Sequence, residues 1–214
     1  MDSFLSYGID QHERLLTALW QHVTLVAITL ALSIVLAALI TALVYRNPKV
    51  REYVQGSLSA FYAVPSLALF ALSIPLLGIG ETTAIVVLVA YNQFMLVRNF
   101  IAGLAEIDNG LVEAARSLGL NRLQTFIHVQ LPLAAPVFIA GIRLAVISTI
   151  SIATIASLID AGGLGDLLFL GLRTNNLDML LWATLLAAAF ALVSGAALTG
   201  IERLFARNRQ EQNL

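Results

Sequence analysis

The sequence predicts an all-α polytopic membrane protein whose 214 residues form a single transmembrane domain with about five membrane-spanning helices. The first observation is compositional: 59% of the residues are hydrophobic and 12% are charged, whereas soluble domains are about half apolar and a quarter charged. The second is the gathering of apolar residues into uncharged runs of about 20 residues, the length that one bilayer crossing needs. Lipid must therefore cover much of the apolar surface.

Five segments have the length and apolarity of a membrane span, and they cover residues 23–45, 57–80, 82–101, 133–159 and 179–201. The first is too long for the apolar core of a cleaved signal peptide, and no basic segment precedes it, so we expect it to remain in the membrane. The second contains Pro65 and Pro75, and the fourth contains Arg143. An odd number of spans places the two termini on opposite sides of the membrane.

Basic residues gather on one side of these predicted spans. They follow the first span, surround the connection between the third and fourth spans, and follow the fifth span: Arg46, Lys49, Arg51, Arg98, Arg116, Arg122, Arg203, Arg207 and Arg209. Only Arg14 and Arg173 fall clearly on the other side. Because basic loops stay in the cytoplasm, we expect the N-terminus outside and the C-terminus in the cytoplasm. Trp20 and Trp182 then lie near the outer interface, where indole rings are favoured.

Polar side chains interrupt two of the spans. Tyr91, Asn92 and Gln93 are consecutive in the middle of the third span, and Arg143 lies inside the fourth. In hydrocarbon each of these groups needs an internal partner or a water-filled cavity. Two interpretations remain open: these residues line a translocation pathway together with Tyr62, or they form hydrogen bonds between helices.

Small residues recur at four-residue spacing in the fifth span, at Ala187, Ala191, Gly195 and Thr199. Such a stripe lets two helix backbones approach closely, and close packing is the main force that associates helices in lipid. We therefore expect this face to pack against another helix, either in this chain or in a second one.

The connection between the third and fourth spans, residues 106–132, is predicted to form two short helices outside the membrane. Asp108 or Asn109 can cap the first helix, which ends at Gly119, where glycine accommodates a left-handed turn. Asn121 can cap the second, and Pro132 is expected to begin the fourth span, where its missing N–H costs little. This helix–turn–helix would lie in the cytoplasm.

The first of these short helices presents small residues beside charged ones, a pattern suited to a groove on another protein. Its residues, together with the glycine and the leucine–proline pair that follow, resemble the EAA loop of type I ABC importer permeases: Glu113, Ala114, Ala115, Gly119, Leu131 and Pro132. The resemblance implies a type I ABC importer permease fold in the bacterial cytoplasmic (inner) membrane. It also implies that this loop binds a separate ATPase subunit and converts closure of the ATPase dimer into movement of the spans.

ATP and Mg²⁺ are then expected on the partner ATPase subunits and not on this chain. The sequence contains no Gly-x-x-x-x-Gly-Lys-Ser/Thr segment, so we expect a non-catalytic subunit without a cofactor of its own. Five spans are too few to enclose a pathway, so a second permease, identical or related, is expected beside this one. An extracytoplasmic solute-binding protein completes the implied assembly.

A second resemblance lies after the fourth span, in the run Ala-Gly-Gly-Leu-Gly-Asp at residues 161–166. It is similar to permeases of the osmoprotectant group, which handle glycine betaine, choline and carnitine. Gly162, Gly163, Gly165 and Asp166 could form an outer gate or a contact for the binding protein, and an ordinary turn between spans is the alternative. Asp160 stands where the resemblance favours glycine.

The resemblance implies import of a small solute, with a quaternary amine favoured and another solute, such as an amino acid of the methionine type, as the alternative. A quaternary amine could contact the rings of Phe61, Tyr62, Tyr91 or Phe94, although ordinary apolar packing is the favoured role for each of these residues. A secondary transporter would need inverted repeats, and none is visible in the sequence.

The remaining function classes are excluded by residues that the sequence lacks. There are no cysteines, and the three histidines are scattered without metal-ligand spacing, so no metal site is expected. The spans hold no convergent set of acids and bases that a membrane enzyme would need. A formal net charge of −1 gives no reason to expect a nucleic-acid partner.

Overall fold

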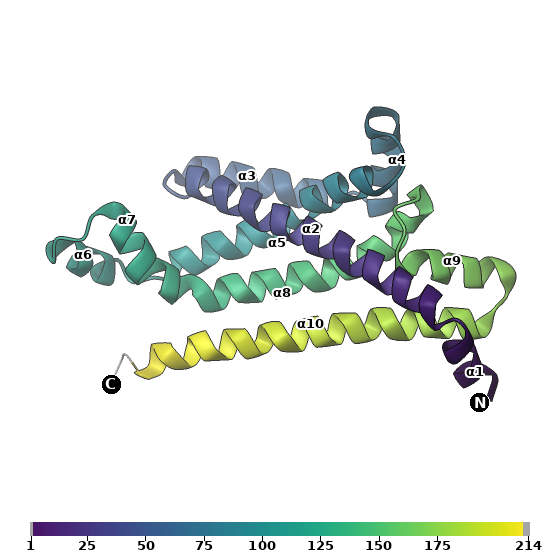
Figure 1. Ribbon diagram of the computed structural model, residues 1–214. Helices are drawn as coiled ribbons and strands as arrows, with labels where there is room; N and C mark the ends of the chain where they lie inside the picture. Colours follow the sequence, from purple (N-terminus) through teal and green to yellow (C-terminus); the bar gives the residue numbers. More distant parts are fainter. Residues whose placement is uncertain (1, 212–214) are drawn as a thin grey trace.

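The computed structural model describes residues 2–211, and within that range every regular element is a helix. Four long helices run side by side along the length of the molecule (Figure 1): α2 (His12–Val44), α5 (Glu81–Ala105), α8 (Leu131–Ala156) and α10 (Leu177–Glu211). The predicted all-α class is confirmed. Four stretches of the described chain are long and apolar enough to cross a membrane, or five if the bent pair α3–α4 counts as one span.

The predicted span at 57–80 is not a single straight helix. It falls on the last part of α3 (Pro48–Tyr62) and all of α4 (Ser66–Leu77), which are bent by 94° relative to each other. Pro65 explains the break, because a proline disfavours helical geometry at the residue before it and cannot donate to the preceding turn. The bend carries α4 over one end of the bundle, while α3 lies beside α5 (Figure 1).

Two further boundaries differ from expectation. The first long helix begins at His12, well before residue 23, and a short helix α1 (Asp2–Asp10) precedes it. Pro132 does not begin the fourth span, because the helical path already runs from Arg122 through a π-helical turn at Phe126–Gln130 into α8. The wider π turn accommodates the proline ring, which would clash with the carbonyl four residues earlier in a regular α-helix.

The apolar core lies where α2, α5 and α8 meet. Leu25 of α2, Leu88 of α5 and Ile150 of α8 belong to one buried cluster. Large apolar side chains remain exposed along the opposite faces of α2 and α10, for example Leu39 and Leu192. In a membrane these faces meet lipid or another helix. The small buried core therefore joins the helices, and lipid or a neighbouring helix covers the remaining apolar surface.

The small-residue stripe of α10 packs against other helices of this same chain, with Ala187 beside a cluster from α2 and α9 and with Gly195 and Thr199 beside α8. Its four members are all half-buried. A Cβ added at Gly195 would lie 3.6 Å from Ile147 Cδ1, and Thr199 Oγ1 accepts a hydrogen bond from Arg143 Nη1 (2.8 Å). The stripe therefore has its partner within the chain.

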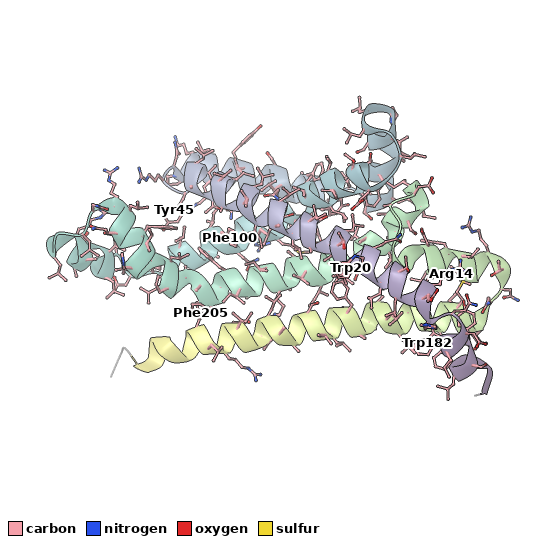
Figure 2. The ribbon with its side chains drawn as sticks, in the orientation of Figure 1. Arg14, Trp20, Tyr45, Phe100, Trp182 and Phe205 are labelled. Atoms are coloured by element: carbon pink, nitrogen blue, oxygen red, sulfur yellow. The ribbon has the colours of Figure 1, made fainter. Side chains whose placement is uncertain are left out.

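The two ends of the bundle carry different connections (Figure 1). The helices α6 (Asn109–Ser117) and α7 (Arg122–Thr125) lie at the end where α10 finishes, and α9 (Leu164–Thr174) lies at the other end with α1. At this second end Trp182 stacks on Phe4 with ring centroids 4.8 Å apart (Figure 2). The side chains of Arg207 and Arg209 lie outside the described residues. The assignment of these ends to the cytoplasm and the exterior stays a prediction.

Candidate functional site

The loop that projects from the bundle beyond α5 has the predicted helix–turn–helix form. Asp108 is the cap of α6, since its Oδ1 accepts a hydrogen bond from the Gly110 N–H (2.8 Å), and Asn109 is already helical. Gly119 follows the helix with φ +89°, a left-handed conformation that favours glycine. The first short helix and its glycine end are therefore confirmed.

The second short helix begins with a reciprocal pair of hydrogen bonds. Asn121 Oδ1 accepts from the Gln124 N–H (2.9 Å), and Gln124 Oε1 accepts from the Asn121 N–H (2.9 Å). This capping box satisfies two N–H groups that a helix start otherwise leaves unpaired. Both short helices are thus fixed by local sequence.

The two alanines of the Glu-Ala-Ala triplet lie on different faces of α6. Ala115 is buried at 7% exposure beside the bundle, whereas Ala114 is exposed. The expectation that both are presented to a partner is therefore wrong for Ala115, because α6 packs one face on the rest of the protein, including α7 and the π-helical turn that follows it. Glu113, next in sequence to Ala114, is exposed as well.

An apolar face of α6 points away from the rest of the molecule. Leu111, Ala114 and Leu118 have the i, i+3, i+7 spacing of one helix face, and the two leucines are 50% and 82% exposed. We name these three residues the α6 outer face. Such a face at the tip of a projecting loop indicates a surface that another protein covers.

The loop is attached firmly to the long helices. Tyr45 at the end of α2 (Figure 2) donates a hydrogen bond from its hydroxyl to the Leu104 carbonyl of α5 (2.9 Å). Leu104 and Val112 of α6 share a small buried cluster with Ala134 of α8. A groove of about 590 Å³ opens beside this cluster and is lined in part by Glu113, Arg116 and Arg122. Leu131 and Pro132 are exposed where the loop continues into α8.

Asn92 and Gln93 are enclosed between helices in the centre of the bundle. Asn92 and Thr149 of α8 exchange hydrogen bonds at 2.9 and 3.0 Å, and Asn92 Nδ2 also reaches Ser33 Oγ of α2 (3.2 Å). Gln93 Nε2 donates to the Val89 carbonyl of its own helix (2.8 Å) and to the Ser33 carbonyl of α2 (3.4 Å). These contacts correspond to hydrogen bonding between helices, the second of the two interpretations that the sequence left open.

Tyr91 belongs to a group of aromatic residues on the other side of α5. Its hydroxyl donates to the Val64 carbonyl, which the break between α3 and α4 leaves without a helical partner. Tyr62 stacks on Phe94 with ring centroids 4.7 Å apart and lies 5.3 Å from the Tyr91 ring. Phe61 lies 6.0 Å from Tyr91. The structure therefore brings together the four aromatic residues that the sequence singled out.

Arg143 is separated from these residues and lies between α8 and α10. Its Nη1 contacts Glu202 Oε2 at 2.9 Å and Thr199 Oγ1 at 2.8 Å. The charge that the fourth span carries is thus neutralised by the last helix. Glu202 was missed from the sequence, although it lies one helical turn beyond Thr199 and so extends the same face.

The glycine-rich turn fits closely over the end of the bundle that carries α9. Asp160, Gly162 and Gly163 have φ values of 60°, 75° and 86°. The left-handed conformation at Asp160 explains why the resemblance favours glycine there. The Gly163 N–H donates to Gln21 Oε1 of α2 (3.1 Å), and a Cβ at Gly165 would overlap the Thr154 carbonyl.

Asp166 lies in the first turn of α9 and borders a cavity of about 430 Å³ shared with α2, where Glu13, Arg14 and Gln21 also line the space. Partial burial raises the pKa of the Asp166 carboxyl above its ordinary value, and the nearby Asp160 carboxylate raises this pKa further. The helix α9 was not predicted, although Leu164, Leu167 and Gly171 are buried at helical spacing.

Comparisons with known proteins agree with this arrangement. The family model of the binding-protein-dependent transport system inner membrane component matches residues 18–211. The carnitine transport permease protein OpuCB of Listeria monocytogenes is 36% identical over 202 residues, which are 94% of this chain and 93% of the relative. The choline transport system permease protein OpuBB of Bacillus subtilis is 34% identical over 189 residues, 88% of this chain and 87% of the relative.

A solved structure has the same fold. The inward-facing MetNI methionine ABC transporter contains a chain that matches with a TM-score of 0.82 at 22% identity, covering 92% of this chain and 98% of that one. These findings confirm the resemblance to ABC importer permeases and to their osmoprotectant group. With several apolar helices and a family match over nearly its whole length, the chain belongs to the inner membrane components of binding-protein-dependent transport systems.

Proposed function

We propose that this chain is the permease subunit of an ABC importer for a small osmoprotectant with a quaternary amine, of the glycine betaine, choline and carnitine class. The solute class is supported by relatives whose names give carnitine and choline as their solutes. The transport role is supported by the family match. In this proposal ATP and Mg²⁺ are held by a separate ATPase subunit, and the chain performs no chemistry of its own.

The single observation that carries the proposed mechanism is the exposed α6 outer face beside Glu113. Its leucines are accessible at the tip of the loop, and the opposite side of α6 is packed on the ends of the long helices. A partner ATPase that holds this face would therefore move α5 and α8 when its own subunits close. The residues we assign to this contact are Glu113, Ala114, Ala115, Gly119, Leu131 and Pro132, of which Ala115 acts through packing.

The remaining partners follow from the same proposal. The end of the bundle with α6 and α7 faces the cytoplasm, and the end with α9 faces the outside. There Gly162, Gly163, Gly165 and Asp166 hold a rigid turn that an extracytoplasmic binding protein can contact. A second permease copy, identical or related, lies against this chain, and the translocation pathway runs between the two past the aromatic group of Tyr62 and Tyr91.

Uptake of labelled glycine betaine, carnitine and choline by cells that express the complete transporter tests this function. We expect Glu113→Arg to reduce uptake at least about tenfold, because a reversed charge at an interface typically costs more than 1.4 kcal/mol. Glu106→Arg is the matched control: it makes the same charge change in the same loop, at an exposed residue that lies outside α6.

The two parts of the proposal can fail separately. Uptake of a different solute, such as an amino acid, with none of the three osmoprotectants carried, would overturn the solute class and leave the permease role. Normal uptake by a Glu113→Arg transporter present at wild-type levels in the membrane would overturn the coupling role of α6.

A further inference from the structure

A polar face of α3 meets α5 at a cavity that the interhelix hydrogen bonds do not use. None of the residues of α3, all of which the structure describes, is buried. Glu52, Gln55 and Ser59 have the i, i+3, i+7 spacing of one face, and they line a cavity of about 350 Å³ together with Phe94 and Arg98 of α5. This face is too polar for hydrocarbon, so it lies beside water.

The cavity is lined by one cationic side chain, Arg98, and one anionic side chain, Glu52. Among the side chains that the structure describes, at residues 4–205, only Arg143 and Glu202 form an ion pair with a nitrogen–oxygen distance within 4 Å. Arg98 and Glu52 are therefore not paired with each other. Arg98 lies seven residues before the end of α5 at Ala105, roughly 10 Å along the helix axis. A charge at that depth calls for a counter-ion or water.

The third component of the cavity is an aromatic face that a cation already contacts. The Arg98 guanidinium carbon lies 5.9 Å from the centre of the Phe94 ring, within the range of cation–π attraction. Tyr62 stacks on Phe94 at 4.7 Å and holds that ring in place. Aromatic faces also attract quaternary ammonium groups, so a solute of that kind competes with Arg98 for Phe94.

We propose that this cavity is a transient site for a zwitterion, in which Arg98 binds the solute carboxylate while Phe94 and Glu52 bind its quaternary ammonium. The volume lies within the range of about 300–1,000 Å³ typical of small-molecule pockets. Arg98 is suited to the carboxylate because its planar guanidinium can donate two parallel hydrogen bonds. Movement of Arg98 toward that carboxylate frees the ring face for the ammonium.

This inference rests on the proposed function and narrows its substrate class. Glycine betaine and carnitine carry a carboxylate and a quaternary ammonium, whereas choline carries only the ammonium. The site therefore distinguishes solutes that all have the same cationic group. Loss of the charge-assisted hydrogen bonds at Arg98 is expected to weaken binding of a zwitterion about tenfold or more, and that of choline little.

The absence of cysteine from the chain allows a direct test that does not depend on transport. Ser59→Cys places a thiol on the cavity, and Ser57→Cys places one on α3 at an exposed residue that does not line it. Each variant is assembled into the complete transporter, and the rate of modification of this chain by uncharged N-ethylmaleimide is measured with saturating glycine betaine, with saturating choline and without solute.

Glycine betaine is expected to slow modification of Ser59→Cys strongly, choline to slow it far less, and neither to affect Ser57→Cys. Adding Arg98→Gln should abolish the protection by glycine betaine, and Arg98→Lys should keep part of it. An unchanged rate at Ser57→Cys in the Arg98 variants shows that α3 keeps its structure.

Equal protection by the two solutes, or protection that survives Arg98→Gln, would overturn the inference and leave Arg98 as a side chain that merely extends toward lipid headgroups. If the transporter carries no osmoprotectant, the proposed function fails. In that case, slower modification of Ser59→Cys in the presence of glycine betaine would still support the zwitterion site, and an unchanged rate would overturn it.

Discussion

The two ends of the molecule are built in opposite ways. At the end that carries α9, residues 160–165 pass so closely over α2 and α8 that a methyl group at Gly165 would overlap the Thr154 carbonyl. At the other end, α6 leaves Leu118 82% exposed, and a methyl group at Gly119 would meet open space. The first end is fixed by internal packing, and the second keeps a surface free. Substitutions at the first should therefore lower stability, and those at the second should lower transport.

The largest effect is expected for Gly165→Ala. The added methyl group must displace the Thr154 carbonyl and the Ser157 side chain, and such overpacking costs about 1–3 kcal/mol or more. The thermal unfolding midpoint of the purified chain in detergent measures this loss. Gly200→Ala is the matched control, since its Cβ has no neighbour within 4 Å and alanine favours a helix. An equal change in both variants would contradict the contrast between the two ends.

Next in size is Leu118→Asp on the α6 outer face. A charge there should disrupt binding of the ATPase subunit by about 2 kcal/mol, the loss typical of an apolar residue at the centre of an interface. The unfolding midpoint of the isolated chain should change little, because exposed substitutions stay within about 0.5 kcal/mol. Co-purification of the ATPase subunit and the midpoint are measured on the same sample. A lower unfolding midpoint with retained ATPase binding would contradict this assignment, because Leu118 would then stabilise the chain and not the contact with the ATPase subunit.

A smaller effect is expected for Gly119→Ala, which tests conformation alone. The backbone there has φ +89°, a conformation that costs a residue with a Cβ about 1–2 kcal/mol. Because the α6–α7 turn lies at the tip of the loop, the cost should appear as faster local amide hydrogen exchange in α6 and not as lower global stability. Unchanged exchange rates in α6 would show that this turn tolerates the strain.

The smallest effect concerns pH. The raised pKa of Asp166 means that the folded state binds its proton more readily than the unfolded state, so stability rises as the pH falls through that pKa. Asp166→Asn should remove this rise and leave stability slightly higher near neutral pH. This prediction is tested by measuring the unfolding midpoints of the wild-type protein and of Asp166→Asn over the acidic pH range. An identical pH dependence of the two proteins would contradict the assignment to Asp166.

Local features were predicted best. The caps at Asp108 and Asn121 and the end at Gly119 depend on side chains within a few residues of the backbone groups that they satisfy, so the sequence itself contains the information. The fold class and the family followed from composition and from the spacing of the Glu-Ala-Ala triplet, Gly119 and the leucine–proline pair.

Features that depend on distant parts of the chain were predicted less well. The contact of Arg143 with Glu202 joins residues of two helices far apart in sequence, and the burial of Ala115 depends on how later segments of the chain pack against α6. The bend at Pro65 could have been read from the proline, but its 94° angle is set by packing against α5. The cavity at Arg98 likewise exists only because α3 lies beside α5.

The most direct test of the central claim uses the two neighbouring alanines of α6. Ala114 is exposed and Ala115 is buried, and the chain has no cysteine of its own. Ala114→Cys and Ala115→Cys are introduced separately into the complete transporter and treated with a short thiol-to-amine cross-linker. We predict that Ala114→Cys becomes linked to the ATPase subunit while Ala115→Cys does not. Failure of Ala114→Cys to link, in a transporter that still hydrolyses ATP and imports solute, would contradict it.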